Sequence, residues 1–283
     1  MADEWWRPLR DLNDRYFPGP SAGVRWDEHV DRLNRELALT GDHELSTFPK
    51  VDLPPAWFIG DVTSVVPGEW VLVFSLNPAA DNDAKFYAER TWDAGSFWEY
   101  QTGWLRSWWN RAFHGPLASL AARCIRHSDD TGDLKGFAAS SIVFAELCPY
   151  ASRSFSLTPD ALRSLREKDI GCRVEAEMTE MMLRQGAPRL LLVNGNRAIE
   201  HFELSYGEFL SWEVREYVSE ARVDRKLWHM QGALREGGRS IPVLGFPFLR
   251  KPRTHNATVE IEQLGRYGAD LVGALPGEAS GAG

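Results

Sequence analysis

Long hydrophobic runs are missing from this chain of 283 residues. Its longest apolar stretches, such as VLVFSL, are far shorter than the roughly 20 residues that a membrane-spanning helix requires. The N-terminal segment MADEWWRPLR is acidic and aromatic and does not have the pattern of a secretion signal. With 43 % hydrophobic residues, the chain has enough apolar material for a packed core. We therefore expect a globular cytoplasmic protein without a membrane partner.

Cysteine is scarce, and the usual motifs for metals and cofactors are absent. Cys124, Cys148 and Cys172 have no C-x-x-C spacing, so we expect reduced thiols rather than disulfides or a zinc or iron–sulfur site. The seven histidines form no H-x-x-x-H or H-x-H pair. Neither G-x-G-x-x-G, G-x-x-x-x-G-K-[ST] nor G-x-S-x-G occurs in the sequence. We therefore expect no cofactor and no metal.

An excess of positive charge is also lacking, because the formal net charge is −8. Such a charge argues against a non-specific nucleic-acid binder, which relies on summed positive charge. Two windows, between residues 99 and 129 and between 236 and 260, nevertheless contain only basic charged residues. These are Arg106, Arg111, Arg123, Arg126, Arg239, Arg250, Lys251 and Arg253. Windows of this kind either arise by chance or mark locally positive surfaces.

Tryptophan is abundant, with twelve in the chain. Five of them lie between positions 92 and 109. Aromatic faces can stack on a flipped base or a sugar ring. Tryptophans in a helical segment more often belong to the core, and we favour that interpretation for most of these five.

The apolar pattern predicts an α/β protein with an N-terminal helical extension. Residues 1–60 form the extension, in which Trp26, Val30, Leu33 and Leu37 share one helix face. Strands are expected at 70–76, 141–147, 189–194 and 239–247. Helices are expected near 97–113, 116–127, after Thr158-Pro159, from 196 and at the C-terminal end. Residues 204–238 are expected to form a helix and a hairpin arm.

This alternation predicts a three-layer α/β/α sandwich with a mostly parallel, four-stranded central sheet over residues 61–275. Residues 276–283 are expected to form a flexible tail. The carboxyl ends of parallel strands meet at one edge, where ligands usually bind. SLNPAAD, ELCPYASR, VNGNR and GFPFLRKPRTHN follow the four strands. We therefore predict a binding edge made of these four segments.

The order of these segments resembles the uracil-DNA glycosylase superfamily. SLNPA (75–79) is similar to the motif after the first strand of that superfamily, and GFPFLRKPRTHNA (245–257) to its final loop. ELCPYASR and LLLVNGNRAIEHF occupy the places between them, and the resemblance covers about residues 68–272. It implies a monofunctional DNA glycosylase that leaves an abasic site, with DNA as its partner. We expect a monomer.

The resemblance implies that Asn77 positions the attacking water. Its side-chain amide would orient the water where the chain turns at Pro78. Asp81 and Asp83 are possible stronger bases for the same water. An asparagine at this place can also simply cap the strand or form a turn. Phe86 and Tyr87 lie where the superfamily places an aromatic ring that stacks on the flipped base, and core packing is the alternative.

The sequence also departs from the superfamily pattern. Phe246 stands where the final motif usually has a histidine, and it cannot donate a hydrogen bond to the leaving base. This puts excision of plain uracil in doubt. His255 is a candidate replacement, but it can equally contact phosphate or cap the last helix.

Glu146 closes the second strand near the place of the residue that reads the base edge. An ionised carboxylate accepts from an exocyclic amine such as cytosine N4 and repels the O4 of uracil. The alternative is an ion pair between Glu146 and Arg153. Contacts with the DNA backbone are expected from Ser152, Arg153, Arg250, Lys251 and Arg253.

These features lead to one main hypothesis and three alternatives. The main hypothesis is excision of a modified cytosine from phage DNA as a defence, because Ala79 and Ala80 leave room for an enlarged base and Glu146 suits an amino edge. The alternatives are a divergent repair glycosylase for uracil or hypoxanthine, a non-catalytic DNA-binding protein, and a hydrolase of small N-glycosides.

Overall fold

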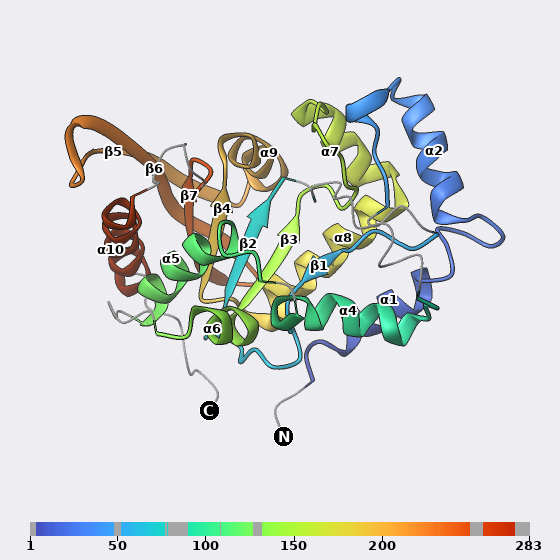
Figure 1. Ribbon diagram of the computed structural model, residues 1–283, viewed down its shortest axis with the longest axis horizontal. Coiled ribbons are helices and arrows are strands. Elements are labelled where there is room, and N and C mark those ends of the chain that lie inside the picture. Colours follow the sequence, from blue (N-terminus) through green and yellow to red (C-terminus); the bar gives the residue numbers. More distant parts are fainter. Residues whose placement is uncertain are drawn as a thin grey trace.

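The computed structural model describes residues 4–47, 52–76, 78, 90–107, 109–126, 132–249 and 257–274 (Figure 1). The helices are α1 (Arg7–Tyr16), α2 (Trp26–Glu36), α4 (Ala94–Ser107), α5 (His114–Arg126), α6 (Leu134–Ser141), α7 (Pro159–Lys168), α8 (Ile170–Met181), α9 (Asn196–Tyr206) and α10 (Thr258–Ala274), with a 3-10 turn at Gly41–His43 and a π turn at Met182–Gly186. None of the helices in these ranges is long and apolar enough to cross a membrane.

In the part of the chain that the structure describes, one mixed sheet forms the centre. Its strands are β1 (Phe58–Ile59), β2 (Val71–Ser75), β3 (Ile142–Glu146), β4 (Leu190–Asn194), β5 (Leu210–Ser219), β6 (Arg222–Glu236) and β7 (Arg239–Phe246). The order across the sheet is β1-β3-β2-β4-β7-β6-β5. The inner strands β3, β2, β4 and β7 run parallel, while β1, β6 and β5 pair antiparallel with their neighbours.

The four predicted strands are therefore confirmed, but the expected sheet of four strands is wrong, because seven strands of the described residues form the sheet. β1 has only two residues, which is too short to give an apolar pattern. The hairpin arm expected within 204–238 does exist, and its second strand joins the sheet through β7. The sheet is thus extended on both sides of the parallel centre.

Helices cover both faces of the sheet because every parallel strand is apolar on both sides. Leu72 and Phe74 of β2 lie in one buried cluster with residues of α7, α8 and α9. Val71 and Val73 point the other way, into a cluster with residues of α5, α6 and α10. This arrangement gives the expected three layers.

The N-terminal helices belong to the same core as β2. Trp26, Val30 and Leu33 of α2 are buried, as the predicted helix face requires, and Leu37 is partly buried. Trp5 stacks on Trp70 with ring centroids 5.9 Å apart. Residues 4–47 thus pack directly on the α/β part of the chain.

Helix starts were predictable where a capping residue is present. The side chain of Thr158 accepts a hydrogen bond from the amide of Ala161, as its place before Pro159 predicts. Asp169 caps α8 in the same way through the amide of Cys172. Neither α8 nor the short α6 was predicted as a separate helix.

The tryptophans and arginines of the segment 92–126 are mostly used inside the fold. Trp98 is buried, and Trp92, Trp104 and Trp109 pack partly against the two clusters. Arg106 pairs with Asp61 at 2.9 Å, and Arg123 pairs with Glu262 at 2.9 Å. Arg111 and Arg126 are exposed, so the first acid-free window keeps part of its positive charge at the surface. The three cysteines are free and buried, as expected.

The β5–β6 hairpin projects from the sheet on the side of α10 (Figure 1). β6 pairs with β7 only from Met230 onward, so Arg222–His229 extends past the carboxyl end of β7. Ser219 Oγ donates to Glu260 Oε1 of α10 at 2.7 Å, and Arg225 pairs with the same carboxylate at 3.2 Å. The hairpin is thus held on α10.

Candidate functional site

Four neighbouring parallel strands end in one row at the carboxyl edge of the sheet. Ser75 of β2 lies opposite Glu146 of β3, and Asn194 of β4 lies opposite Phe246 of β7. Phe74 pairs with Val193, so Ser75 and Asn194 are the next neighbours along these two strands. By strand alternation, all four side chains share the face that α5 and α10 cover. The carboxyl ends of β3 and β4 therefore lie on either side of the carboxyl end of β2, as the predicted binding edge requires.

Three side chains of this row have a buried polar atom without a hydrogen-bond partner. They are Ser75 Oγ, Glu146 Oε2 and Asn194 Nδ2, within the part of the chain that the structure describes. A buried polar group without a partner costs about 1–3 kcal/mol. We call Ser75, Glu146 and Asn194 the edge row. Three unpartnered polar atoms at neighbouring strand ends indicate a binding place for a polar ligand, because such a ligand would supply the missing hydrogen bonds.

Burial changes the charge of Glu146. Loss of water around its carboxyl group, and to a smaller degree the nearby charge of Glu175, raises the pKa of Glu146 to about 8. At neutral pH the side chain is therefore mostly protonated and can both donate and accept a hydrogen bond. Arg153 pairs with Asp42 at 3.5 Å and not with Glu146. The ion pair considered as the alternative role of Glu146 does not form.

A buried ion pair supports the backbone directly behind Glu146. Arg166 donates to the carbonyl oxygen of Leu147 at 3.1 Å and pairs with the carboxylate of Glu175. Thr179 donates to the other oxygen of Glu175 at 2.7 Å. Both carboxylate oxygens of Glu175 are thus satisfied, in contrast to Glu146 Oε2.

The segment after β3 runs beside the corner that follows β2. The amides of Leu147 and Cys148 donate to the carbonyl oxygens of Ser75 and Leu76 at 3.0 and 2.9 Å. The amide of Ser152 donates to Pro78 O at 3.2 Å. Pro78 is therefore bonded to the loop that carries the predicted DNA contacts, and Ser152 itself is buried.

Aromatic rings lie beside the edge row on the same face of the sheet. The ring of His114, at the start of α5, is 5.6 Å from that of Phe144, two residues before Glu146. Phe113 packs on Phe248 at 5.8 Å. Burial lowers the pKa of His114 to about 4, and its Nδ1 accepts from the amide of Asn110 at 3.0 Å. His114 is therefore neutral, with its proton on Nε2.

Phe248 and Leu249 fix the turn after β4. The amide of Leu249 donates to Asn194 Oδ1 at 3.3 Å, which leaves Nδ2 as the unpartnered end of that amide. Gly195 has φ of 110°, a conformation that side chains rarely adopt, and it lies under Phe248. This turn leads directly into α9.

Most of the predicted catalytic, substrate-binding and DNA-binding residues lie outside the described residues. These are Asn77, Asp81, Phe86, Tyr87, Arg250, Lys251, Arg253 and His255. Of the others, Glu146 and Pro78 lie at the carboxyl edge as predicted. Phe246 is fully buried in the cluster with α5 and α10, so it fills space beside Asn194 and offers no surface to a substrate.

Sequence reasoning missed Ser75, Asn194 and His114. Asn194 carried a usable signal, because a polar residue that closes the run LLLV marks the end of a buried parallel strand. Ser75 carried a similar but weaker signal. Nothing in the sequence pattern indicated that His114 lies beside the same edge.

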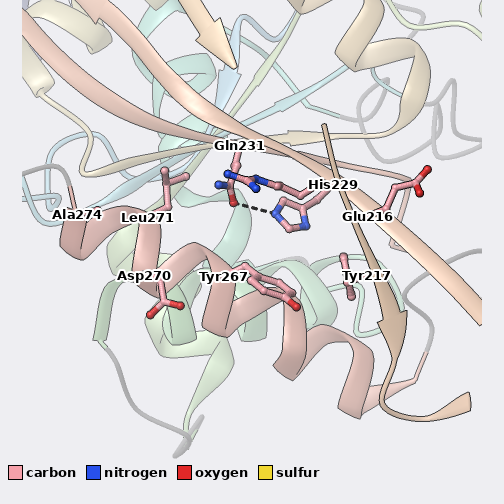
Figure 2. Close-up of a pocket in the computed structure, with 9 residues that line it drawn as sticks. Glu216, Tyr217, His229, Gln231, Tyr267, Asp270, Leu271 and Ala274 are labelled. Atoms are coloured by element: carbon pink, nitrogen blue, oxygen red, sulfur yellow. Dashed lines mark hydrogen bonds between the residues drawn. The ribbon is translucent and has the colours of Figure 1, made fainter. Parts of the chain in front are cut away.

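A metal cluster and a surface hollow are the other kinds of site to consider among the described residues. No group of three or more histidine, cysteine, aspartate or glutamate side chains there could bind a metal. An open hollow of about 460 Å³ lies between the β5–β6 hairpin and α10 (Figure 2). Its imidazole, His229, bonds to Gln231 Oε1 at 3.1 Å. This hollow shares no residue with the edge row.

Models of known protein families do not match this chain, and a search of curated proteins finds no significant match. The resemblance to the uracil-DNA glycosylase superfamily therefore rests on the four strand-end motifs and their order.

Proposed function

We propose that this protein is a DNA glycosylase that hydrolyses the N-glycosidic bond of a flipped, non-standard base. The observation that carries the proposal is the edge row, with its three unpartnered polar atoms beside Pro78. A base outside the helix presents a flat, polar edge that needs several hydrogen bonds at once. The four strand-end motifs support the same reaction.

The reaction makes separate demands on the two sides of the scissile bond. Water adds its oxygen to the sugar C1′ and releases one proton to solvent, the C1′–N bond breaks with its electron pair going to the base, and the base takes up a proton. Asn77, which follows β2 directly, is assigned to orient the water. Ser75, Glu146 and Asn194 supply donors to the base as its negative charge develops.

A protonated Glu146 can take the role of the histidine that the superfamily usually has at the position of Phe246. A carboxylic acid whose pKa is about 8 can give its proton to the leaving base near neutral pH. It can also donate to cytosine N3 while its other oxygen accepts from N4. We propose a modified cytosine in phage DNA as the substrate, and defence against phage as the purpose.

The test is to incubate the protein with DNA that contains cytosine, modified cytosines, uracil or hypoxanthine, and to reveal abasic sites by alkaline cleavage. We expect abasic sites from modified cytosine, and their loss in Asn77→Ala. Gln185→Ala removes an exposed amide side chain of the turn Met182–Gly186, at the other end of β4, and serves as the matched control, with full activity. Absence of abasic sites on every DNA would contradict the proposal.

A further inference from the structure

The outer edge of the sheet is long and exposed, and it combines valines with charged residues. β5 is the last strand, and β6 is its pairing partner in the described sheet. Large apolar side chains with high exposure gather on this hairpin: Phe209 at 54 %, Val214 at 58 %, Val218 at 50 % and Val223 at 89 %. Proteins usually protect an edge of this kind, so its exposure indicates a pairing surface.

The backbone of β5 has hydrogen-bonding groups that face outward. The amide of Arg235 donates to the carbonyl oxygen of Phe209, so this carbonyl points toward β6, while the amide of Phe209 donates to Tyr206 O in the preceding turn. Alternation along an antiparallel ladder then directs residues 211, 213, 215 and 217 toward β6 as well. Residues 210, 212, 214, 216 and 218 direct theirs outward.

The sequence of β5 is complementary to itself in one antiparallel register. When Val214 lies opposite Val214 of a second copy, Leu210 lies opposite Val218 and Glu213 opposite Arg215. Trp212, Val214 and Glu216 then meet the second copy as hydrogen-bonded pairs, whereas the amide of Leu210 already donates to Gly207 O and Val218 O already accepts from Gln263. Glu213 and Arg215, which pair with each other within one strand, also fall opposite each other on the pairs whose side chains are closest. We propose that β5 binds β5 of a second copy in this register and makes a two-fold symmetric dimer.

Contacts with α10 hold the β5–β6 hairpin in a fixed position before it pairs. Glu260, which is buried in α10, holds its tip through Ser219 and Arg225, and Gln263 donates to Val218 O at 2.9 Å. A fixed strand loses little freedom when it binds. The ladder with β6 shifts register between Val218 and Ser219, which sets a natural end to the paired stretch. This conclusion differs from the expected monomer and does not depend on the glycosylase activity.

The test is sedimentation equilibrium of the full chain over a range of concentrations. The wild type is expected to dimerise, and Val214→Lys to weaken dimerisation at least about tenfold, because it places two like charges on the symmetry axis. Val223→Lys introduces the same charge at an exposed valine outside β5 and should leave dimerisation unchanged. Circular dichroism checks that both variants are folded.

A charge exchange tests the register itself. Glu213→Arg alone and Arg215→Glu alone should each weaken the dimer, whereas the double exchange should restore it. A wild type that stays monomeric at all concentrations would overturn the proposal. So would a dimer that neither Val214→Lys nor the single exchanges affect, or one that forms only when DNA is added.

Discussion

Buried polar groups are treated differently under the N-terminal helices and at the carboxyl edge of the sheet. Under α2, the side-chain nitrogen of Asn34 donates to Leu45 O, and its side-chain oxygen accepts from the backbone amide of Leu45, both at 2.8 Å. His29 bonds to Asp169 at 2.6 Å, and Tyr150 donates to the same carboxylate at 2.7 Å. Ser75, Glu146 and Asn194 of the edge row, by contrast, each have an unpartnered atom.

The difference separates polar groups that stabilise the fold from those that are available for binding. A buried group whose hydrogen bonds are complete holds its neighbours in place, and its loss is costly. An unpartnered group lowers stability unless a ligand satisfies it. The region under α2 is thus expected to respond to mutation through stability, and the edge row through activity.

The largest effect on stability is expected from Asp169→Ala. This change removes the carboxylate shared by His29 and Tyr150 and the cap of α8, and we expect a loss of about 3–5 kcal/mol in the free energy of unfolding. Urea denaturation measures this loss. Excision per folded molecule should remain unchanged, and a stability loss below about 1 kcal/mol would contradict the account.

Glu146→Gln is expected to lower excision about a hundredfold or more, because glutamine cannot give a proton to the leaving base. Single-turnover cleavage of the substrate DNA measures the effect. The matched control is Glu177→Gln, which changes an exposed glutamate of α8. Equal activity in the two variants would remove Glu146 from the reaction.

The pH dependence of stability follows from the raised pKa of Glu146. The folded protein holds this proton up to about pH 8, whereas the unfolded chain releases it near the ordinary pKa of 4.5. The contribution of Glu146 to stability is therefore fully present below pH 4.5 and is lost as the pH rises toward about 8. The slope is at most about 1.4 kcal/mol per pH unit, the value for a single proton.

Urea denaturation at several pH values between these limits tests this sign. The decrease in stability with rising pH should be smaller in Glu146→Gln than in the wild type. Parallel curves for the two proteins would show that Glu146 does not titrate as described.

Ser75→Ala is expected to have the smallest effect on the fold. It removes a hydroxyl group without a partner among the described residues, so the change in unfolding free energy should be below about 1 kcal/mol and can be favourable. Excision should fall about tenfold, because one donor to the base is lost. A large loss of stability would show that Ser75 has a structural role instead.

The sequence predicted the central strands well, because their apolar runs are long and continuous and are bounded by polar residues or proline. It did not predict β1 as a strand, or that β5 and β6 extend the sheet, because their pairing depends on partners elsewhere in the chain. For the same reason a pattern along one segment could not reveal that Arg153 pairs with Asp42.

The candidate site was predicted in part. Glu146 and the corner at Pro78 could be recognised from their positions after apolar strands. The raised pKa of Glu146 and the unpartnered atoms of Ser75 and Asn194 could not, because burial and missing partners are properties of the packed molecule. The predicted ionised form of Glu146 therefore becomes a mostly protonated one at neutral pH.

The most direct test of the account compares Asn194→Ala with Asn34→Ala in the abasic-site assay, with unfolding by urea measured in parallel. The account predicts that Asn194→Ala loses at least about tenfold in excision per folded molecule, and about 1–3 kcal/mol in stability because the amide of Leu249 loses its acceptor. Asn34→Ala should lose about 1–3 kcal/mol in stability and keep its excision per folded molecule. Unchanged excision in Asn194→Ala, or a specific loss in Asn34→Ala, would contradict the assignment of the edge row as the site.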